Sequence, residues 1–119
     1  MISVILPTFN EVDSGYLSLI MSRLARLRQA EILVIDGGST DGTVEFTAEH
    51  GVEVLSLPGS SRAARLNLGI KQSQGEMLLL HHPRSLIDPD DIEAMRTLSD
   101  GDQLTWGGLY SSVRFGPSI

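Results

Sequence analysis

The sequence predicts an α/β fold in which a mainly parallel sheet is covered by helices on both faces. Short apolar runs alternate along the chain with segments whose apolar residues have helical spacing, as in proteins built from strand-helix-strand units. The apolar runs are aliphatic, and aromatic residues make up only 5% of the chain. Because 119 residues suffice for one core, we expect a single domain over residues 1–119.

Each expected strand is an apolar or alternating run bounded by turn-forming residues. The first run is rich in β-branched residues and is stopped by Pro7, and the second is fully apolar. The final segment lacks helical spacing and is expected to be extended. The strands are expected at Ile2 to Leu6, Ile32 to Ile35, Val52 to Leu57, Met77 to Leu80 and within Gln103 to Phe115.

The expected helices are recognised by apolar residues three and four positions apart. The first presents Leu17, Ile20, Met21, Leu24 and Leu27 on one face, and the third presents Ala63, Leu66 and Ile70. Asp41 is expected to cap the second helix, and Gly51 to end it. The helices are expected at Tyr16 to Leu27, Gly42 to His50, Arg62 to Ser73 and from Pro89 onward.

Composition excludes several classes of protein and site. The formal net charge is -6 and the pI is about 4.8, so no basic surface is expected for nucleic acid. The chain has no cysteine, which excludes disulfides and thiolate zinc sites and fits a reducing compartment. The apolar runs are far too short for a transmembrane segment, and the N-terminus does not resemble a signal peptide. We therefore expect a cytoplasmic protein.

The polar loops that follow the strands should meet at one edge of the sheet and form a ligand-binding crevice. Asp36 and Glu11 offer acceptors for a base or a ribose, and Arg62 offers a cation for phosphate at a helix N-terminus. Each residue also has a purely structural interpretation. Asp36 or Asp41 could cap a turn, Arg62 could be solvated, and Asn67 could hold a loop instead of a ligand. P-loop, Gly-x-Gly-x-x-Gly and serine-hydrolase motifs are absent.

Two motifs together resemble a known family. Ser3-Val-Ile-Leu-Pro-Thr-Phe-Asn-Glu11 and Val34-Ile-Asp-Gly-Gly-Ser-Thr-Asp-Gly-Thr43 are similar to the nucleotide-binding half of family 2 glycosyltransferases, which have the Rossmann-like GT-A fold. Arg62-Ala-Ala-Arg-Leu-Asn-Leu-Gly69 and Gln74-Gly-Glu-Met-Leu-Leu-Leu80 resemble the helix and strand that come next. Trp106-Gly-Gly108 resembles a later loop in one bacterial branch of the family.

The resemblance implies a glycosyltransferase-like protein that binds a nucleotide-sugar donor, usually a UDP-sugar. Asp36 would then hydrogen-bond the base, and Arg62 would lie near the ribose or the diphosphate. Pro7, Thr8, Asn10 and Glu11 would line the nucleoside pocket. Gly38 and Ser39 in the loop after Asp36, together with Asn67 and Arg84, complete the predicted substrate-binding set.

The sequence departs from the family at the metal motif. Family members carry Asp-x-Asp, which holds a divalent metal such as Mn or Mg against the donor diphosphate. The corresponding residues here are His82-Pro83-Arg84. Hard cations prefer oxygen ligands and are repelled by Arg84, and the adjacent His81 and His82 point to opposite faces of a strand. We therefore expect no metal site. Arg84 could replace the metal's charge, or it could lie in solvent at a degenerate site.

The sequence also departs from the family in length. Family members continue into an acceptor-binding half that carries the catalytic base, and no residue here matches that base, so no catalytic residue is assigned. Two functions remain open: sugar transfer to an unknown acceptor, or a catalytically inactive nucleotide-sugar-binding or protein-interaction module. A nucleotidyltransferase is disfavoured because the first strand lacks a following Gly-rich basic loop. An open sheet edge leads us to expect a homodimer.

Overall fold

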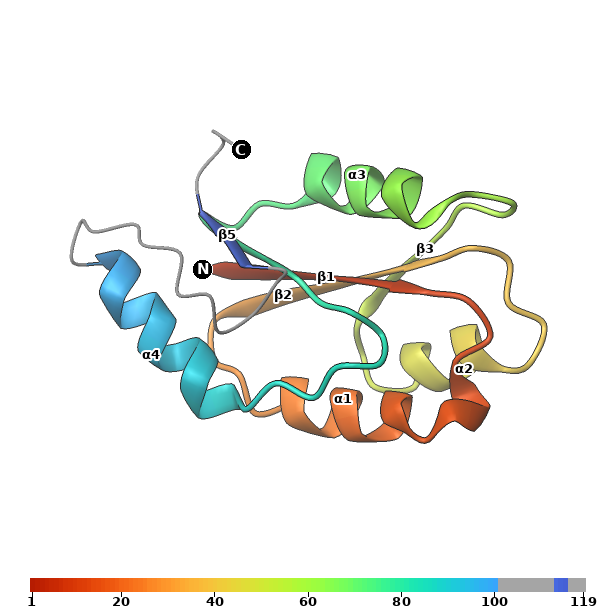
Figure 1. The fold of residues 1–119 in the computed structure, drawn as a ribbon, viewed down its shortest axis with the longest axis horizontal. Helices are drawn as coiled ribbons and strands as arrows, with labels where there is room; N and C mark the ends of the chain where they lie inside the picture. The colour runs from red at the N-terminus through yellow and green to blue at the C-terminus, as the bar shows by residue number, and fades with distance from the viewer. Residues whose placement is uncertain (101–112, 116–119) are drawn as a thin grey trace.

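The computed structural model describes residues 1–100 and 113–115, which form a sheet with helices on both sides (Figure 1). The strands are β1 (Ile2–Thr8), β2 (Ala30–Asp36), β3 (Glu53–Ser56), β4 (Met77–Leu80) and β5 (Val113–Phe115). The helices are η1 (Val12–Ser14, a 3-10 turn), α1 (Tyr16–Leu24), α2 (Thr43–Ala48), α3 (Arg62–Gln72) and α4 (Pro89–Asp100).

The sheet has the strand order β3-β2-β1-β4-β5. The first four strands run parallel, and β5 pairs with β4 in the antiparallel sense. This arrangement confirms the predicted α/β fold with a mainly parallel sheet. Thr8 lies opposite Asp36 in the register of β1 and β2, so both strands end at the same edge of the sheet.

The two faces of the sheet bury separate apolar clusters. Side chains alternate along β1, so Val4 packs into the cluster with α1, whereas Ile5 packs into the cluster against α3. Figure 1 shows α3 on one side of the sheet and α1 and α2 on the other. The central strand is therefore buried from both sides, which explains why its sequence reads as a continuous apolar run.

Helix α3 packs on the sheet through a face that differs in part from the predicted one. Leu66 and Ile70 contact the cluster as expected, but Ala63 is exposed. The closest approach is at Gly69, where an added Cβ would clash with Ile5 Cγ2. Ala63 lies in the first turn, beside the loops at the edge of the sheet, and the apolar contacts begin with Leu66.

Several predicted boundaries were wrong by a few residues. Helix α1 ends at Leu24 instead of Leu27, because the backbone amide of Leu27 donates to the carbonyl of Leu24 and tightens the last turn. Strand β2 continues through Asp36, which makes this carboxylate the last residue of the strand. Within the predicted extended segment Gln103 to Phe115, only β5 is described, and Trp106 to Gly108 lie outside the described residues.

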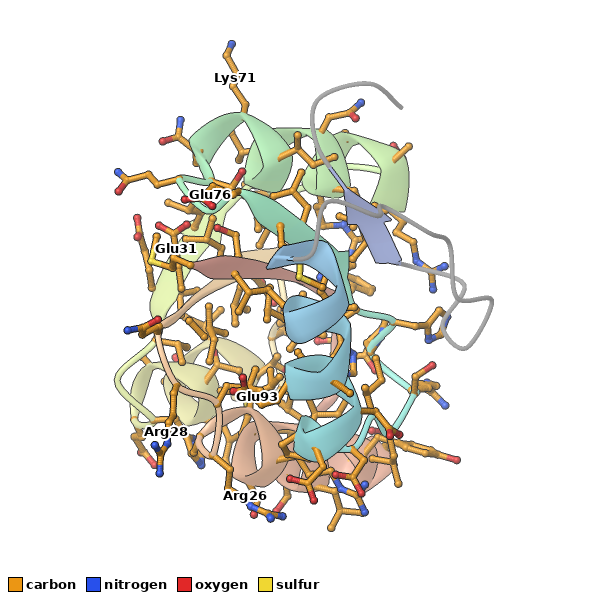
Figure 2. The ribbon with its side chains drawn as sticks, turned by 90° about the vertical axis from the view of Figure 1, so that its left-hand side faces the viewer. Arg26, Arg28, Glu31, Lys71, Glu76 and Glu93 are labelled. Atoms are coloured by element: carbon orange, nitrogen blue, oxygen red, sulfur yellow. The ribbon has the colours of Figure 1, made fainter. Side chains whose placement is uncertain are left out.

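The end of the molecule opposite the strand-end loops faces the viewer in Figure 2. There Glu31 Oε1 accepts hydrogen bonds from Ser3 Oγ (2.7 Å) and from the amide of Gln74 (2.9 Å), which tie β1, β2 and the turn before β4 together. Among the described residues, the structure has no helix that is long and apolar enough to cross a membrane.

Candidate functional site

The carboxylate of Asp36 lies at the carboxyl edge of the sheet and is almost fully buried, with 1% of its surface exposed. Its Oδ1 accepts from the hydroxyls of Thr8 (2.7 Å) and Ser39 (2.5 Å). Its Oδ2 accepts from the amides of Gly38 (3.0 Å) and Ser39 (2.7 Å). Burial acts to raise the pKa of Asp36, but these hydrogen bonds outweigh it and lower the pKa below its usual value.

The four hydrogen bonds occupy the acceptor capacity of Asp36 in this structure. The carboxylate therefore shapes the loop after β2, as the structural interpretation of this residue expected. A base that hydrogen-bonds to Asp36 has to displace one hydroxyl, and the Ser39 hydroxyl is the more accessible because Thr8 is fully buried. Base recognition by Asp36 stays a prediction.

The loops after β1 and β2 are hydrogen-bonded to each other. The amide of Asn10 donates to Ser39 Oγ (2.8 Å), and the amide of Thr40 donates to Asn10 Oδ1 (2.9 Å). Asn10 has φ 52°, in the left-handed region that asparagine tolerates better than most residues. The amide of Glu11 donates to Thr43 Oγ1 (2.9 Å). These bonds fix the two loops as one unit.

Asp41 contributes to the same unit instead of acting as the helix N-cap. The N-cap of α2 is Gly42, whose φ is 95°. Asp41 lies one residue earlier, where its Oδ1 accepts from the amide of Thr43 (3.0 Å) and its Oδ2 accepts from the amide of Val12 (3.3 Å). The side chain thus connects the start of α2 to η1. The predicted helix start was one residue too early.

Across from these loops, two arginines and a histidine lie close together. Arg62 is the first residue of α3, and its Nη2 lies 2.6 Å from His82 Nε2. The Arg84 amide donates to His82 Nδ1 (3.0 Å), and the Arg84 guanidinium pairs with the carboxylate of Glu11 (Nε to Oε1, 3.6 Å). We call Glu11, Arg62, His82 and Arg84 the arginine cluster. It brings together three of the predicted site residues.

Glu11 is the buried member of the arginine cluster. Its side chain is 9% exposed, whereas that of Arg84 is 59% exposed. Among the described residues, none donates a hydrogen bond to Glu11 Oε1. A buried carboxylate oxygen without a donor is unfavourable unless a ligand or water supplies one. Glu11 therefore presents an open acceptor beside a cation.

Two further predicted site residues, Pro7 and Asn67, lie within a strand and a helix instead of in the loops. Pro7 is buried within β1, and Asn67 is exposed on α3, about 7.5 Å along the helix axis from Arg62 at 1.5 Å per residue. Arg65 was not predicted. Its Nη1 donates to the carbonyl of Thr8 (2.8 Å), and its side chain covers Gly37. The signal was its position one helical turn after Arg62, on the side that faces the loops.

The residues at the family's metal motif do not fit a divalent metal. His82 and Arg84 are engaged with each other and with Arg62, and a cation beside two guanidinium groups is repelled. Asp36 is saturated, which leaves Glu11 as the carboxylate nearest to them. Within residues 1–94, whose side chains are described, no group of three or more His, Asp or Glu side chains could hold a metal ion.

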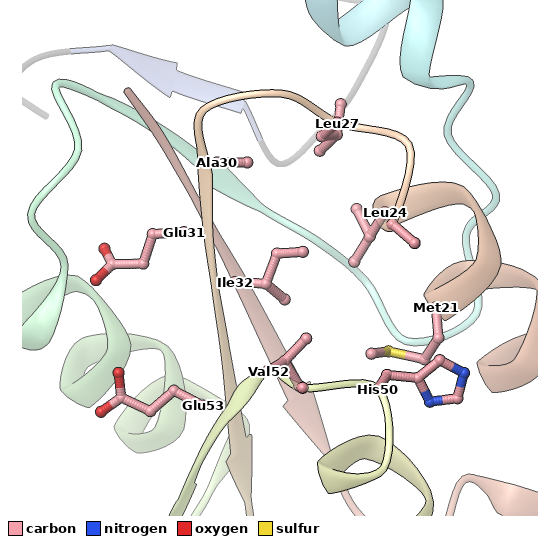
Figure 3. A pocket seen from close by; sticks show the side chains of 11 residues that line it. Met21, Leu24, Leu27, Ala30, Glu31, Ile32, His50, Val52 and Glu53 are labelled. Atoms are coloured by element: carbon pink, nitrogen blue, oxygen red, sulfur yellow. The ribbon is translucent and has the colours of Figure 1, made fainter.

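A separate hollow of about 340 Å³ lies near the opposite edge of the sheet and contains none of the predicted site residues. Figure 3 shows Met21, Leu24, Ile32 and Val52 lining it on one side of β2, and Glu31 pointing away on the other. Of the charged or polar side chains at this pocket, Glu31 and Glu53 point away from the apolar ones, so they do not converge as the groups that orient a substrate do. We therefore place the candidate site at the strand-end loops.

Comparison with known proteins agrees with the geometry. The model of the family described as Glycosyl transferase family 2 matches residues 3–112. The chain is 38% identical to glycosyltransferase AglE of Haloferax volcanii over 86 residues, which cover 65% of this chain and 28% of AglE. It is 26% identical to AglJ of the same organism over 117 residues, which cover 97% of this chain and 38% of AglJ.

Solved structures share the fold. The Staphylococcus aureus TarS fragment 1–349 superposes with a TM-score of 0.76 at 23% identity, over 84% of this chain and 32% of that one. The mannosyltransferase PcManGT of Pyrobaculum calidifontis, solved with GDP-Man and Mn²⁺, gives a TM-score of 0.68 at 19% identity, over 76% and 30% of the two chains.

The matched region is a part of each relative. This chain spans between 16% and 38% of the length of the curated relatives that it matches. The match of the family model nevertheless runs through nearly all of this sequence, and the two motifs that first indicated the resemblance lie in β1 and β2 and in the loops that follow these strands. The chain belongs to glycosyl transferase family 2.

Proposed function

We propose that this chain binds the nucleotide diphosphate of a nucleotide-sugar donor, a UDP-sugar in the first instance, for transfer of the sugar to an acceptor. The observation that carries the proposal is the open oxygen of Glu11 beside Arg84, with Arg62 joined to the same group of residues through His82. A buried acceptor next to cations complements a ligand with hydroxyls beside phosphates, which is the chemistry of a nucleotide. TarS 1–349 has been solved with UDP and with UDP-GlcNAc, which supports the same donor class.

Calorimetry tests the binding step. We expect UDP and UDP-GlcNAc to bind, and GDP and ADP to bind more weakly, because the proposed donor is a UDP-sugar. Glu11→Ala should weaken UDP binding, and Ser22→Ala on the exposed face of α1 is the matched control. Absence of UDP binding in a protein shown by circular dichroism to be folded would refute the proposal.

A pair of variants tests base recognition separately. If the base displaces the Ser39 hydroxyl from Asp36, Ser39→Ala keeps or improves uridine binding because it removes the competing donor. Asp36→Asn should weaken uridine binding because the carboxylate that accepts from the base is lost. Equal losses in both variants would show that this loop acts on the ligand only through its shape.

Turnover separates the two candidate functions. An active glycosyltransferase releases UDP from UDP-GlcNAc when an acceptor or water is used, whereas an inactive donor-binding or interaction module binds UDP-GlcNAc and releases none. Mass spectrometry of the nucleotide after incubation distinguishes the two.

We further propose that the chain forms a homodimer through the free edge of β3. This strand ends the sheet, and the described residues include no strand that pairs with its outer edge. Unpaired edge strands tend to pair with another chain. Light scattering at micromolar concentration should give the mass of two chains, and a single-chain mass would contradict the proposal.

A further inference from the structure

We infer that the arginine cluster holds the donor diphosphate directly, without a divalent metal. This inference rests on the proposed nucleotide binding and specifies how the diphosphate is held. It departs from the chemistry implied by the family, in which carboxylates hold a metal and the metal holds the phosphates. Three features of this chain support it.

The first feature is the conflict between donors at His82. The ring has one N–H when it is neutral, yet Nδ1 faces the Arg84 amide at 3.0 Å and Nε2 faces Arg62 Nη2 at 2.6 Å. Whichever nitrogen carries the proton, one of these contacts places two donors against each other. If the Arg62 side chain moves aside, an anionic oxygen can accept from both its guanidinium and Nε2–H, which removes the conflict.

The second feature is the placement of charge. The arginine cluster contains two guanidinium groups, from Arg62 and Arg84, and one carboxylate, from Glu11, so it carries a net charge of +1 while His82 is neutral. Burial, and then the neighbouring Arg62, lower the pKa of His82, which keeps it neutral at pH 7. The cluster therefore attracts a diphosphate and repels a free divalent cation.

The third feature is that the two arginines are held from different elements. Arg62 begins α3, whose N-terminus is capped by the Ser61 side chain and favours anions. Arg84 follows β4 and is held at its Nε by the buried Glu11 carboxylate. Guanidinium groups bind phosphate with paired N–H donors, and here the residues that carry two of them, Arg62 and Arg84, both contact His82.

Calorimetry in EDTA with uridine, UDP and inorganic pyrophosphate tests the inference. We expect UDP to bind more tightly than uridine in EDTA, pyrophosphate to bind on its own, and added Mn²⁺ to change UDP affinity less than twofold. Arg62→Gln and Arg84→Gln should each weaken UDP and pyrophosphate binding about tenfold and leave uridine unchanged. Arg26→Gln, an exposed arginine beyond the end of α1, is the matched control and should change nothing.

The outcomes separate this inference from the proposed function. UDP binding that requires Mn²⁺, or that neither arginine variant weakens, refutes metal-free binding of the diphosphate by the arginine cluster. It does not refute the proposed donor site. If pyrophosphate binds, uridine does not, and UDP binds no more tightly than pyrophosphate, the result supports diphosphate binding by the arginine cluster and refutes the nucleotide site. Failure of all three ligands to bind a protein with wild-type circular dichroism and melting temperature refutes both.

Discussion

Replacing Asp36 tests how the loop after β2 is held in place. The carboxylate is 1% exposed and accepts four hydrogen bonds, two from backbone amides and two from hydroxyls. Asp36→Ala removes all four acceptors at once and leaves the buried Thr8 hydroxyl and the loop amides without a partner. A hydrogen bond to a charged group contributes about 1.5–3 kcal/mol, and bonds within one network are not additive. We expect the free energy of unfolding to fall by about 3–5 kcal/mol.

Asp36→Asn should lower the free energy of unfolding by less than Asp36→Ala does, because the side-chain amide can make part of the same hydrogen-bond network. Its oxygen can accept from the amides of Gly38 and Ser39, while its NH₂ group faces the hydroxyls of Thr8 and Ser39, which can rotate to accept. The expected loss is about 1–2 kcal/mol. The free energies of unfolding of both variants can be measured by urea titration at pH 7, with circular dichroism as the signal. Equal m-values then serve as the check on two-state behaviour.

The pH dependence supplies an independent measurement. The pKa of Asp36 is lowered in the folded state, so its contribution is fully present above the unfolded value near 3.8 and is lost as the pH falls through the folded value. The difference in unfolding free energy between wild type and Asp36→Asn should therefore shrink below pH 3.8. A free energy of unfolding within about 1 kcal/mol of wild type for Asp36→Ala at pH 7, or equal instability of the Asn and Ala variants, would show that the Asp36 carboxylate does not hold this loop.

The remaining predictions concern packing, a buried histidine and the contact between loops. Gly69→Ala should lower the free energy of unfolding by about 1–3 kcal/mol, because the new Cβ clashes with Ile5, as urea unfolding will show. Burial lowers the pKa of His81, so stability should fall as the pH drops from about 6.5 through the folded value, and His81→Gln should flatten that slope. Thr43→Val should lower the free energy of unfolding by about 1–2 kcal/mol. It should also speed hydrogen exchange at the Glu11 amide, because it removes the hydroxyl that accepts from this amide.

Exposed residues serve as controls for these three predictions. Asn67→Ala on α3, His50→Gln after α2 and Thr40→Val in the loop should each change the free energy of unfolding by less than about 0.5 kcal/mol. A Gly69→Ala protein as stable as wild type would show that α3 can shift away from the sheet. An unchanged pH slope in His81→Gln would assign the acid sensitivity to another group.

The strands and the edge of the sheet that carries the crevice were predictable from local pattern. The run around Val34 could only be a strand buried on both faces, and a parallel sheet brings the ends of such strands together. The hydrogen-bond partners of Asp36 were harder to predict from the sequence. Thr8 lies 28 residues away on another strand, and its contact with Asp36 depends on the register of the two strands. The contact between Arg62 and His82 depends likewise on two loops from separate units, and no local pattern encodes it.

The role of Ala63 shows where periodicity alone is insufficient. Helical spacing placed it on the apolar face, but the first turn of α3 lies beside the crevice loops, not over the sheet. Gly69 was overlooked as a packing residue because glycine has no side chain to count in an apolar pattern, although its small size is what allows close approach to Ile5. Such close contacts between a helix and a sheet depend on which strand residues lie opposite the helix.

Because of the hydrogen bonds between the loops after β1 and β2, the residues of the candidate site differ in how much of the fold depends on them. Asn10, Ser39 and Thr43 hold backbone groups, so changing them alters the fold as well as the ligand. Arg62 and Arg84 project from the start of a helix and from a loop, and little of the core depends on them. Under the proposed function, substitutions at Arg62 and Arg84 should therefore change phosphate binding with little effect on the fold, whereas substitutions at Asn10, Ser39 and Thr43 should change both.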